Sequence, residues 1–487
     1  MSQGGSRPSD VRLLLASRFG RGVEVIGALV VVAGLLLVWA LAPTYPNYDS
    51  YYHLVWGREL RSGAVPSFEA YAAPTQHPLY VAIAGLLGLF GERADRGLVG
   101  LCFLSHAALV VGAYRLGAAV FGRWSGLLGA LFVASSASFL LYSARGYVDM
   151  PFLALVVWAG VAATRRDGSR VPMVLLVLAG LLRPEAWVLA GLYWLWGVRR
   201  ADRAGRLWLT AGAIAAPVLW ALVDLWATGD PLHSLNATSE LADDLGREQG
   251  LAAVPGAFVS FVGATVRPPV FVLALVGSLL ATRRPGLRAA RIPLALALAG
   301  VVTFVGTGVL GLAILPRYLT VPSVAFCLFA GYALAGFTSL PPRHPWRRCW
   351  IRCAAAAAAL GAVGLVLLAP SAGRVAEELR FLRAIHSGLV DLLDEPQVRA
   401  SMKCGPLTFP NYRLVPDARW HLDAPRGRVT ARSARRRPTG VAVFLTTRKG
   451  LRRYGFADGA SPTTNVPDPG FSLIARNERM AAYARCD

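Results

Sequence analysis

The stretch Thr44–Tyr80, TYPNYDSYYHLVWGRELRSGAVPSFEAYAAPTQHPLY, sets the expected organisation of the chain. It directly follows the first long apolar segment and carries Asp49, Glu59 and Glu69, although the 487 residues contain only 28 Asp and Glu. A carboxylate beside a lipid bilayer is costly unless it is paired or has a chemical task. Asp49 is therefore the first candidate for a catalytic group.

The composition is typical of a membrane protein with many spans. Hydrophobic residues make up 55% of the chain and charged residues only 16%, against about 25% charged in an ordinary soluble protein. The net charge of +22 would suggest nucleic acid in a soluble chain. Here many arginines lie in short loops between apolar runs, which is the pattern of cytoplasmic loops. We therefore expect a multi-pass plasma-membrane protein in contact with lipid, and no nucleic-acid partner.

The first apolar run, Val23–Pro43, predicts a retained transmembrane helix. Its length is sufficient for a hydrocarbon core of about 30 Å, and no cleavage site of a signal peptide follows it. Four arginines precede it, so we expect residues 1–22 to be cytoplasmic. Asp49 then lies on the outer side of the membrane.

The short run Pro78–Phe90 decides the parity of the later spans. If it crossed the membrane, Asp149 would face the cytoplasm. If it lies at the interface, Arg115 and Arg123 fall inside, and Asp149 faces the outer side together with Asp49. The second arrangement obeys the positive-inside rule, and a run this short is often interfacial.

Counting onward gives eleven spans within a transmembrane domain of residues 23–368, with an outer loop at 44–96. Residues 227–250 form a further expected outer loop. The fold class is thus mainly α, a polytopic helical bundle. The expected spans are Val23–Pro43, Gly97–Val120, Trp124–Tyr142, Pro151–Ala163, Val171–Leu182, Ala186–Trp196, Leu207–Trp226, Pro269–Leu280, Ile292–Leu312, Thr320–Phe337 and Ala354–Leu368.

The tail, residues 369–487, predicts a small α+β domain outside the membrane. Apolar residues at three- and four-residue spacing between 375 and 392 predict an amphipathic helix. GVAVFLTT (440–447) and FSLIARN (471–477) are typical of short strands. Cys404 and Cys486 lie near the two ends of this domain, so an outer location would permit a disulfide between them. Ligand spacing for a metal is not found in the sequence.

The order of these segments resembles the GT-C superfamily of polyprenyl-phosphate-sugar-dependent glycosyltransferases, nearest to its protein-mannosyltransferase and aminoarabinose-transferase branch. The resemblance covers roughly residues 23–340, and it rests on the order and sidedness of the motifs more than on any single one. After the first helix these motifs are YDSYYHLVWGRELRSGAVPSFEAY (48–71), HPLYVAIAGLLGLFG (77–91), YSARGYVDMP (142–151), LLRPEAW (181–187), GDPLHSL (229–235) and LPRYLTVPSVAF (315–326).

The resemblance implies inverting transfer of a sugar, on the outer face, from a polyprenyl-phosphate donor to a hydroxyl of a glycan, lipid or protein acceptor. A hydroxyl is a weak nucleophile and needs a base. Asp49 matches the family's first-loop acid in this role, although it could instead cap a helix that begins at Ser50. Asp149 could orient the acceptor or hold a divalent cation with Asp49, or it could simply start the next helix. Metal dependence divides this superfamily, and we expect no ion here.

The leaving lipid phosphate needs fixed cations near the membrane surface. Arg317 matches the family's late-helix Arg-Tyr pair and is the first candidate for this phosphate, with Arg183 the second. Either could instead be an interfacial arginine that snorkels. Glu185 fits better as an ion-pair partner of Arg183 than as a second acid. Residues that could line the acceptor site are Tyr52, His53, His77 and Glu185, and for the two histidines a structural role is the alternative.

Two other functions stay open at this point. A transporter or lipid flippase would also be polytopic, but an internal repeat with broken helices is then expected and is not found in the sequence. A membrane scaffold that displays the tail domain would not explain why Asp49, Asp149, Arg183 and Arg317 all fall on one side. The identities of the sugar and its carrier are open, and a cell-envelope glycan is the preferred acceptor.

Overall fold

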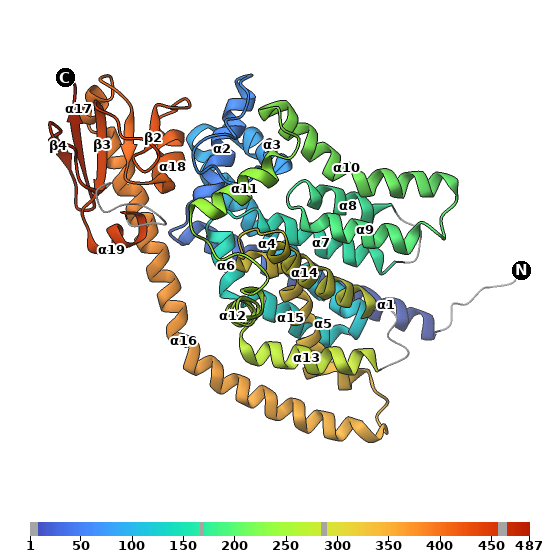
Figure 1. Ribbon diagram of the computed structural model, residues 1–487. Helices are drawn as coiled ribbons and strands as arrows, with labels where there is room; N and C mark the ends of the chain where they lie inside the picture. Colours follow the sequence, from blue (N-terminus) through green and yellow to red (C-terminus); the bar gives the residue numbers. More distant parts are fainter. Residues whose placement is uncertain (1–7, 166–169, 284–289, 456–464) are drawn as a thin grey trace, which may run out of the picture.

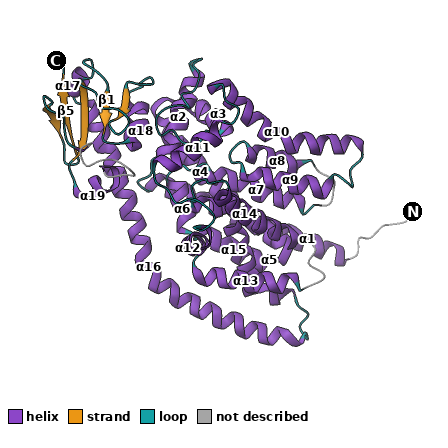
Figure 2. Cartoon of the chain, in the orientation of Figure 1, coloured by secondary structure: helices purple, strands orange, loops and turns teal. Residues whose placement is uncertain are grey.

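The molecule is a large bundle of helices with a small sheet at one end (Figure 1; Figure 2). The computed structural model describes residues 8–165, 170–283, 290–455 and 465–487. Part of the expected cytoplasmic segment, residues 1–7, lies outside the described residues. The mainly α fold that the composition predicts is confirmed.

Most helices of the bundle begin and end close to the expected spans. The helices up to α16 are α1 (Pro8–Leu41), α2 (Tyr48–Arg61), α3 (Pro78–Leu87), α4 (Ala94–Phe121), α5 (Arg123–Ala134), α6 (Ala137–Ala144), α7 (Asp149–Ala163), α8 (Val171–Gly180), α9 (Glu185–Gly197), α10 (Arg203–Thr228), α11 (His233–Asp244), α12 (Val254–Val266), α13 (Pro268–Thr282), α14 (Arg291–Val309), α15 (Thr320–Ala335) and α16 (Pro345–Asp394).

In the described ranges, five helical segments are long and apolar enough to cross a membrane, or up to seven if each of two bent pairs is one span. The bent pairs are α5 with α6, at 55°, and α12 with α13, at 100°. The chain is accordingly a multi-pass membrane protein, and the count of eleven spans stays a prediction.

Helix α15 forms the centre of the bundle. It belongs to the apolar helical segment Pro316–Ser339, and 89% of the apolar stretch of that segment is buried. Helix α15 packs on α5 at a contact between backbones: a Cβ added to Gly331 would lie 2.4 Å from the carbonyl oxygen of Ser125 and 2.6 Å from the backbone nitrogen of Gly129. Small residues let membrane helices approach this closely. This rigid core supports the turn just before α15, which carries Arg317.

Helix α2 lies outside the candidate spans and starts with Asn47, whose side-chain oxygen accepts a hydrogen bond from the N–H of Ser50 at 3.1 Å. The alternative in which Asp49 caps a helix beginning at Ser50 is therefore wrong. Asn caps a helix as well as Asp does, and its earlier position places Asp49 within the first turn.

Helix α3 crosses α2 where Gly57 and Gly85 touch, because a Cβ on Gly57 would lie 2.4 Å from the backbone nitrogen of Gly85. The ten residues of α3 end before Gly91, which has a positive φ of 60° and breaks the path into α4. The interfacial placement of residues 78–90 stays a prediction.

Residues 227–250 were expected as a loop but contain α11. The carboxylate of Asp224, at the end of α10, accepts hydrogen bonds from the N–H and the hydroxyl of Ser234 at 2.9 and 2.8 Å. It also accepts one from the Gln76 amide at 3.0 Å. This buried network holds α11 against the loop that precedes α3. It is a tertiary contact, which the local sequence pattern does not predict.

The C-terminal unit, residues 396–487, contains α17 (Pro396–Ser401), α18 (Val415–His421), α19 (Arg448–Gly450) and a five-stranded sheet of order β2-β1-β3-β5-β4. Strand β1 runs parallel to β2 and β3, while β5 is antiparallel to β3 and β4. The strands are β1 (Leu407–Phe409), β2 (Val429–Ala431), β3 (Gly440–Leu445), β4 (Ser472–Arg476) and β5 (Met480–Arg485). The two predicted strands match β3 and β4.

Helix α16 connects this unit to the bundle, and a disulfide links two distant parts of the unit. The expected last span and the expected amphipathic helix are one continuous helix, the 50-residue α16 (Figure 1). Its apolar positions Leu379, Leu382, Ile385 and Leu389 are all buried, as their spacing predicts. A disulfide links Cys404 to Cys486. The boundary expected between 368 and 369 falls inside α16, so the domain limits remain predictions.

Candidate active site

A cavity of about 380 Å³ opens where the start of α2, the end of α11, the turn before α15 and the C-terminal unit meet. Its size lies in the lower part of the usual range for ligand pockets. Its lining is unusually rich in tyrosine, and Asp49 is the single carboxylate among the described residues that line it. The aromatic and charged lining residues are Tyr48, Tyr142, Tyr147, Tyr318, Tyr412, Asp49, Arg247 and Arg317.

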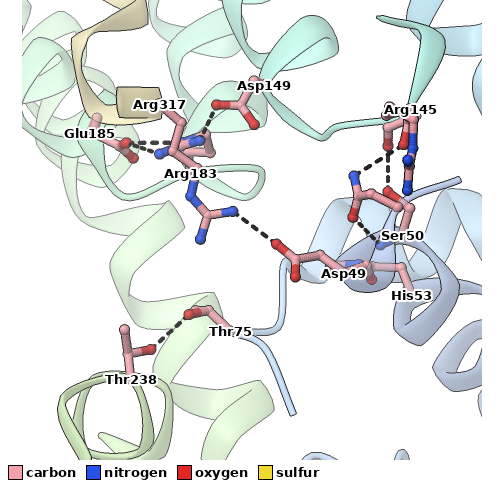
Figure 3. Close-up of polar contacts among 12 residues, drawn as sticks. Asp49, Ser50, His53, Thr75, Arg145, Asp149, Arg183, Glu185, Thr238 and Arg317 are labelled. Carbon is pink, nitrogen blue, oxygen red and sulfur yellow. Dashed lines mark hydrogen bonds and ion pairs between the residues drawn. The ribbon is translucent and has the colours of Figure 1, made fainter. Parts of the chain in front are cut away.

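Asp49 and Arg317 form an ion pair in this cavity (Figure 3). The Arg317 Nη1 donates to Asp49 Oδ2 at 2.8 Å, and the two side chains are 22% and 25% exposed. Asp49 lies in the first turn of α2, where the positive end of the helix dipole favours a negative charge. A ligand in the cavity can therefore reach both members of the pair.

A second acid–arginine group lies behind the cavity and does not line it. Arg183 is bonded to both Asp149 and Glu185, and its Nε donates to Glu185 Oε1 at 2.9 Å (Figure 3). The side-chain exposures of Asp149, Arg183 and Glu185 are 0%, 3% and 8%. In this buried triad two carboxylates share one cation, an arrangement that depends strongly on that cation.

The buried triad is in contact with the cavity wall through an aromatic ring. The guanidinium of Arg183 lies over the ring of Tyr318, 5.4 Å from its centroid, and Tyr318 lines the cavity beside Arg317. A cation over an aromatic face is attracted to it. Asp149, the first residue of α7, is thus placed to act on the cavity through Arg183.

His53 and His77 lie behind Asp49 as a stacked pair, with ring centroids 5.1 Å apart. The Nδ1 of His53 donates to the backbone oxygen of Asp49 at 2.5 Å, because a carbonyl oxygen can only accept. Burial lowers the pKa of His53 to about 4, so this ring is neutral at pH 7. Burial also lowers the pKa of His77 well below its usual value. The pair supports the backbone that carries Asp49.

The structure brings together Asp49, Asp149, Arg183 and Arg317, which the sequence singled out from four separate motifs (Figure 3). None of Tyr52, His53, His77 and Glu185 lines the cavity, and Tyr52 packs with Trp56 in a buried cluster, so a place for these four residues at an acceptor site stays a prediction.

Several cavity residues were not found from the sequence. Arg247 and Thr238 belong to the segment expected as a loop, and Tyr412 to a tail without a family resemblance. The hydroxyl groups of Thr238 and Thr75 lie 2.7 Å apart and join α11 to the loop before α3 (Figure 3). Tyr142 and Tyr147 belong to the motif YSARGYVDMP (142–151), and their aromatic side chains were the only feature of the sequence that could have marked them as cavity residues.

Within the described parts of the chain, no group of three or more His, Cys, Asp or Glu side chains is placed to hold a metal ion. The two cavity arginines favour an anion, such as a phosphate, over a cation.

Comparison with known proteins gives a fold but no sequence family. No family model and no curated protein matches the chain. The structure resembles ArnT from Cupriavidus metallidurans bound to undecaprenyl phosphate, with 15% identity, a TM-score of 0.55, and coverage of 94% of this chain and 97% of that one. It also resembles apo ArnT from that organism, at 13% identity, a TM-score of 0.53, and coverage of 96% and 98%. ArnT is an aminoarabinose transferase with the GT-C fold, so the fold that the sequence motifs indicated is confirmed.

Proposed function

We propose that the chain is a GT-C-type glycosyltransferase that moves a sugar, with inversion, from a polyprenyl-phosphate donor to a hydroxyl of a cell-envelope acceptor. The observation that carries this proposal is the pairing of Asp49 with Arg317 in one cavity, which places a carboxylate beside a guanidinium, a group suited to binding phosphate. The shared fold supports it, because the ArnT structure was solved with undecaprenyl phosphate.

Asp49 is the general base of the proposed reaction. The acceptor hydroxyl donates its proton to the Asp49 carboxylate while its oxygen forms a bond to the anomeric carbon of the sugar. The bond from that carbon to the phosphate oxygen breaks, and the electron pair leaves with the polyprenyl phosphate. A positioned base of this kind typically contributes a factor of about 10² to 10⁴ to the rate.

Arg317 and Arg247 stabilise the charge that develops on the leaving phosphate. A guanidinium can hold two phosphate oxygens at once. Because Arg317 is paired with Asp49, a phosphate that binds to Arg317 competes with the carboxylate for this cation. Donor binding thus frees Asp49 to accept a proton from the acceptor.

Asp149 and Arg183 act as positioning residues in this account. They lie outside the cavity and touch it through Tyr318, so we assign no proton transfer and no phosphate contact to them. Their task is to hold the turn that carries Arg317.

We further propose that the reaction occurs on the outer face of the plasma membrane. The positive-inside pattern supports a cytoplasmic N terminus, eleven spans and an extracytoplasmic C terminus. The disulfide between Cys404 and Cys486 supports the same side for the C-terminal unit, because disulfides persist in oxidising compartments.

The test is sugar transfer by purified protein in nanodiscs, supplied with a panel of polyprenyl-phosphate sugars and a cell-envelope extract. Transfer of a labelled sugar by the wild type and by Glu69→Gln, but not by Asp49→Asn, is the expected result. Glu69 is the matched control, because it belongs to the same outer loop but does not line the cavity. Lipid movement across the bilayer without any transfer would instead identify a transporter.

A further inference from the structure

The C-terminal unit contributes one residue, Tyr412, to the described lining of the cavity. Tyr412 lines the cavity, and its ring meets the ring of Tyr48 edge to face at 5.2 Å between centroids. The short 3-10 turn of Tyr412 starts at Asn411, whose side-chain oxygen accepts a hydrogen bond from the N–H of Arg413 at 3.0 Å. The side-chain amide of Asn411 also donates to the backbone oxygen of Tyr454. The position of Tyr412 is therefore fixed within its own unit.

That unit is also fixed relative to α2, beside which it lies (Figure 1). The almost fully buried Arg419 pairs with Glu59 at 2.7 Å. Arg58 donates to the backbone oxygens of Trp420 and Arg419 at 3.1 and 2.9 Å. Because α2 also carries Asp49, these contacts hold Tyr412 and the proposed base in a constant arrangement.

The chemistry of the cavity lining matches a carbohydrate. The C–H face of a sugar ring packs on an aromatic face, and its hydroxyls pair with hydroxyl groups such as those of Thr75 and Thr238. Recognition of a peptide typically uses a free strand edge or an apolar groove for a helix. The described lining of this cavity instead offers tyrosine rings, hydroxyl groups and two arginines around a single carboxylate.

We propose that the acceptor is a carbohydrate whose ring packs on Tyr412, and that Tyr412 is the positioning residue that brings one acceptor hydroxyl to Asp49. The transfer step rests on the proposed function. In it, the hydroxyl proton goes to Asp49, the acceptor oxygen bonds to the anomeric carbon of the donor, and the polyprenyl phosphate leaves with the bonding electrons.

The experiment is saturation-transfer NMR, which needs no turnover. The full-length protein is held in nanodiscs, because alkyl-glycoside detergents would compete as sugars. The probe is an oligosaccharide fraction released from a bacterial cell envelope, and the aromatic protons of the protein are irradiated. We expect saturation of sugar C–H protons in the wild type and affinity reduced about tenfold in Tyr412→Ala, which matches the strength of one aromatic contact.

Two variants control this result. Tyr412→Phe keeps the ring, so its affinity should stay within about twofold of the wild type. Tyr483→Ala removes a tyrosine of the same unit that packs on Phe444 and does not line the cavity, so it should bind as the wild type does. Should Tyr412→Ala fail to fold, Tyr412→Leu retains apolar bulk without the aromatic face and should show the same loss.

The proposal is overturned if the wild type binds no oligosaccharide, or if Tyr412→Ala and Tyr412→Leu bind it normally. It is also overturned if envelope peptides are bound in place of the oligosaccharides, or if Tyr412→Ala loses undecaprenyl phosphate, because Tyr412 would then act on the donor. Oligosaccharide binding that depends on Tyr412, without sugar transfer from any donor, would support the role of Tyr412 in carbohydrate binding and contradict only the proposed function.

Discussion

The two acid–arginine groups of this protein contain the same side-chain types in opposite surroundings. Asp49 and Arg317 pair one to one in a cavity, with about a quarter of each side chain exposed. Asp149 and Glu185 share Arg183 in the interior, where none of the three is more than 8% exposed. An acid near the membrane surface is therefore a candidate for chemistry only when a ligand can reach its oxygens.

Removing the cation of the buried triad should have the largest effect on stability. Arg183→Met leaves two buried carboxylates without a partner, which typically costs about 3 to 5 kcal/mol. Thermal unfolding of the purified protein measures this loss. The triple variant Arg183→Met, Asp149→Asn, Glu185→Gln removes all three charges and should recover much of the stability. If the triple variant is no more stable than Arg183→Met, uncompensated charge is not the cause.

Removing the cation of the cavity pair should act on function instead. Arg317→Met should lower sugar transfer by about 10² to 10³, the usual effect of losing one charge-stabilising donor, and should weaken undecaprenyl phosphate binding. Stability should change by about 1 kcal/mol or less, because the pair is partly exposed. Arg426→Met is the control, since Arg426 is exposed, pairs with Glu69 and does not line the cavity. Normal phosphate binding by Arg317→Met would refute its role.

Asp149→Asn tests whether Asp149 supports the structure while Asp49 takes part in the chemistry. The variant leaves one carboxylate for one cation in the triad, so we expect a stability loss of about 1 to 2 kcal/mol. Transfer should stay within about tenfold of the wild type, since Asp149 does not line the cavity and its ion-pair partner Arg183 reaches the cavity wall through the ring of Tyr318. A loss of transfer as large as that of Asp49→Asn, in a folded protein, would make Asp149 a second catalytic acid.

The residues that hold the two acids in place, Arg183 for Asp149 and His53 for Asp49, should respond differently to pH. Asp149 is held by an arginine, whereas the backbone of Asp49 is held by His53, whose pKa is lowered to about 4 by burial. The unfolded chain protonates this histidine near its usual pKa of about 6.5, so it binds more protons than the folded chain between pH 6.5 and 4. Stability should therefore fall as the pH drops through this window.

This pH effect is measured by thermal unfolding across the window, with His53→Gln as the comparison. The glutamine variant should show a shallower fall, because its side chain does not titrate. Equal slopes for the two proteins would assign the pH dependence to other groups, such as His77.

Much of the bundle could be predicted from sequence because membrane helices follow from hydropathy alone. The helices from α4 to α15 match the expected spans within a few residues in most cases. The start of α2 was predicted wrongly, because Asn47 and Asp49 are both good caps and only the fold selects between them. The continuity of α16 was missed because its apolar and amphipathic halves have different patterns.

The sequence singled out individual residues of the site but did not predict which of them pair. Asp49 and Arg317 each stood out because charges are rare beside apolar runs, yet their pairing joins distant segments and depends on the packing of α15. Arg247 and Tyr412 carried no signal, since loops and small mixed domains are rich in such residues. Their roles come from tertiary contacts: the network of Asp224 for α11 and the docking of Arg419 on α2.

The most direct test of the account is one pair of measurements on Asp49→Asn: undecaprenyl phosphate affinity and the rate of sugar transfer. We predict that affinity is kept or increased, because the carboxylate that competes for Arg317 is gone. The rate of transfer should fall by about 10² to 10⁴. Transfer at the wild-type rate by this variant would contradict the assignment of Asp49 as the base.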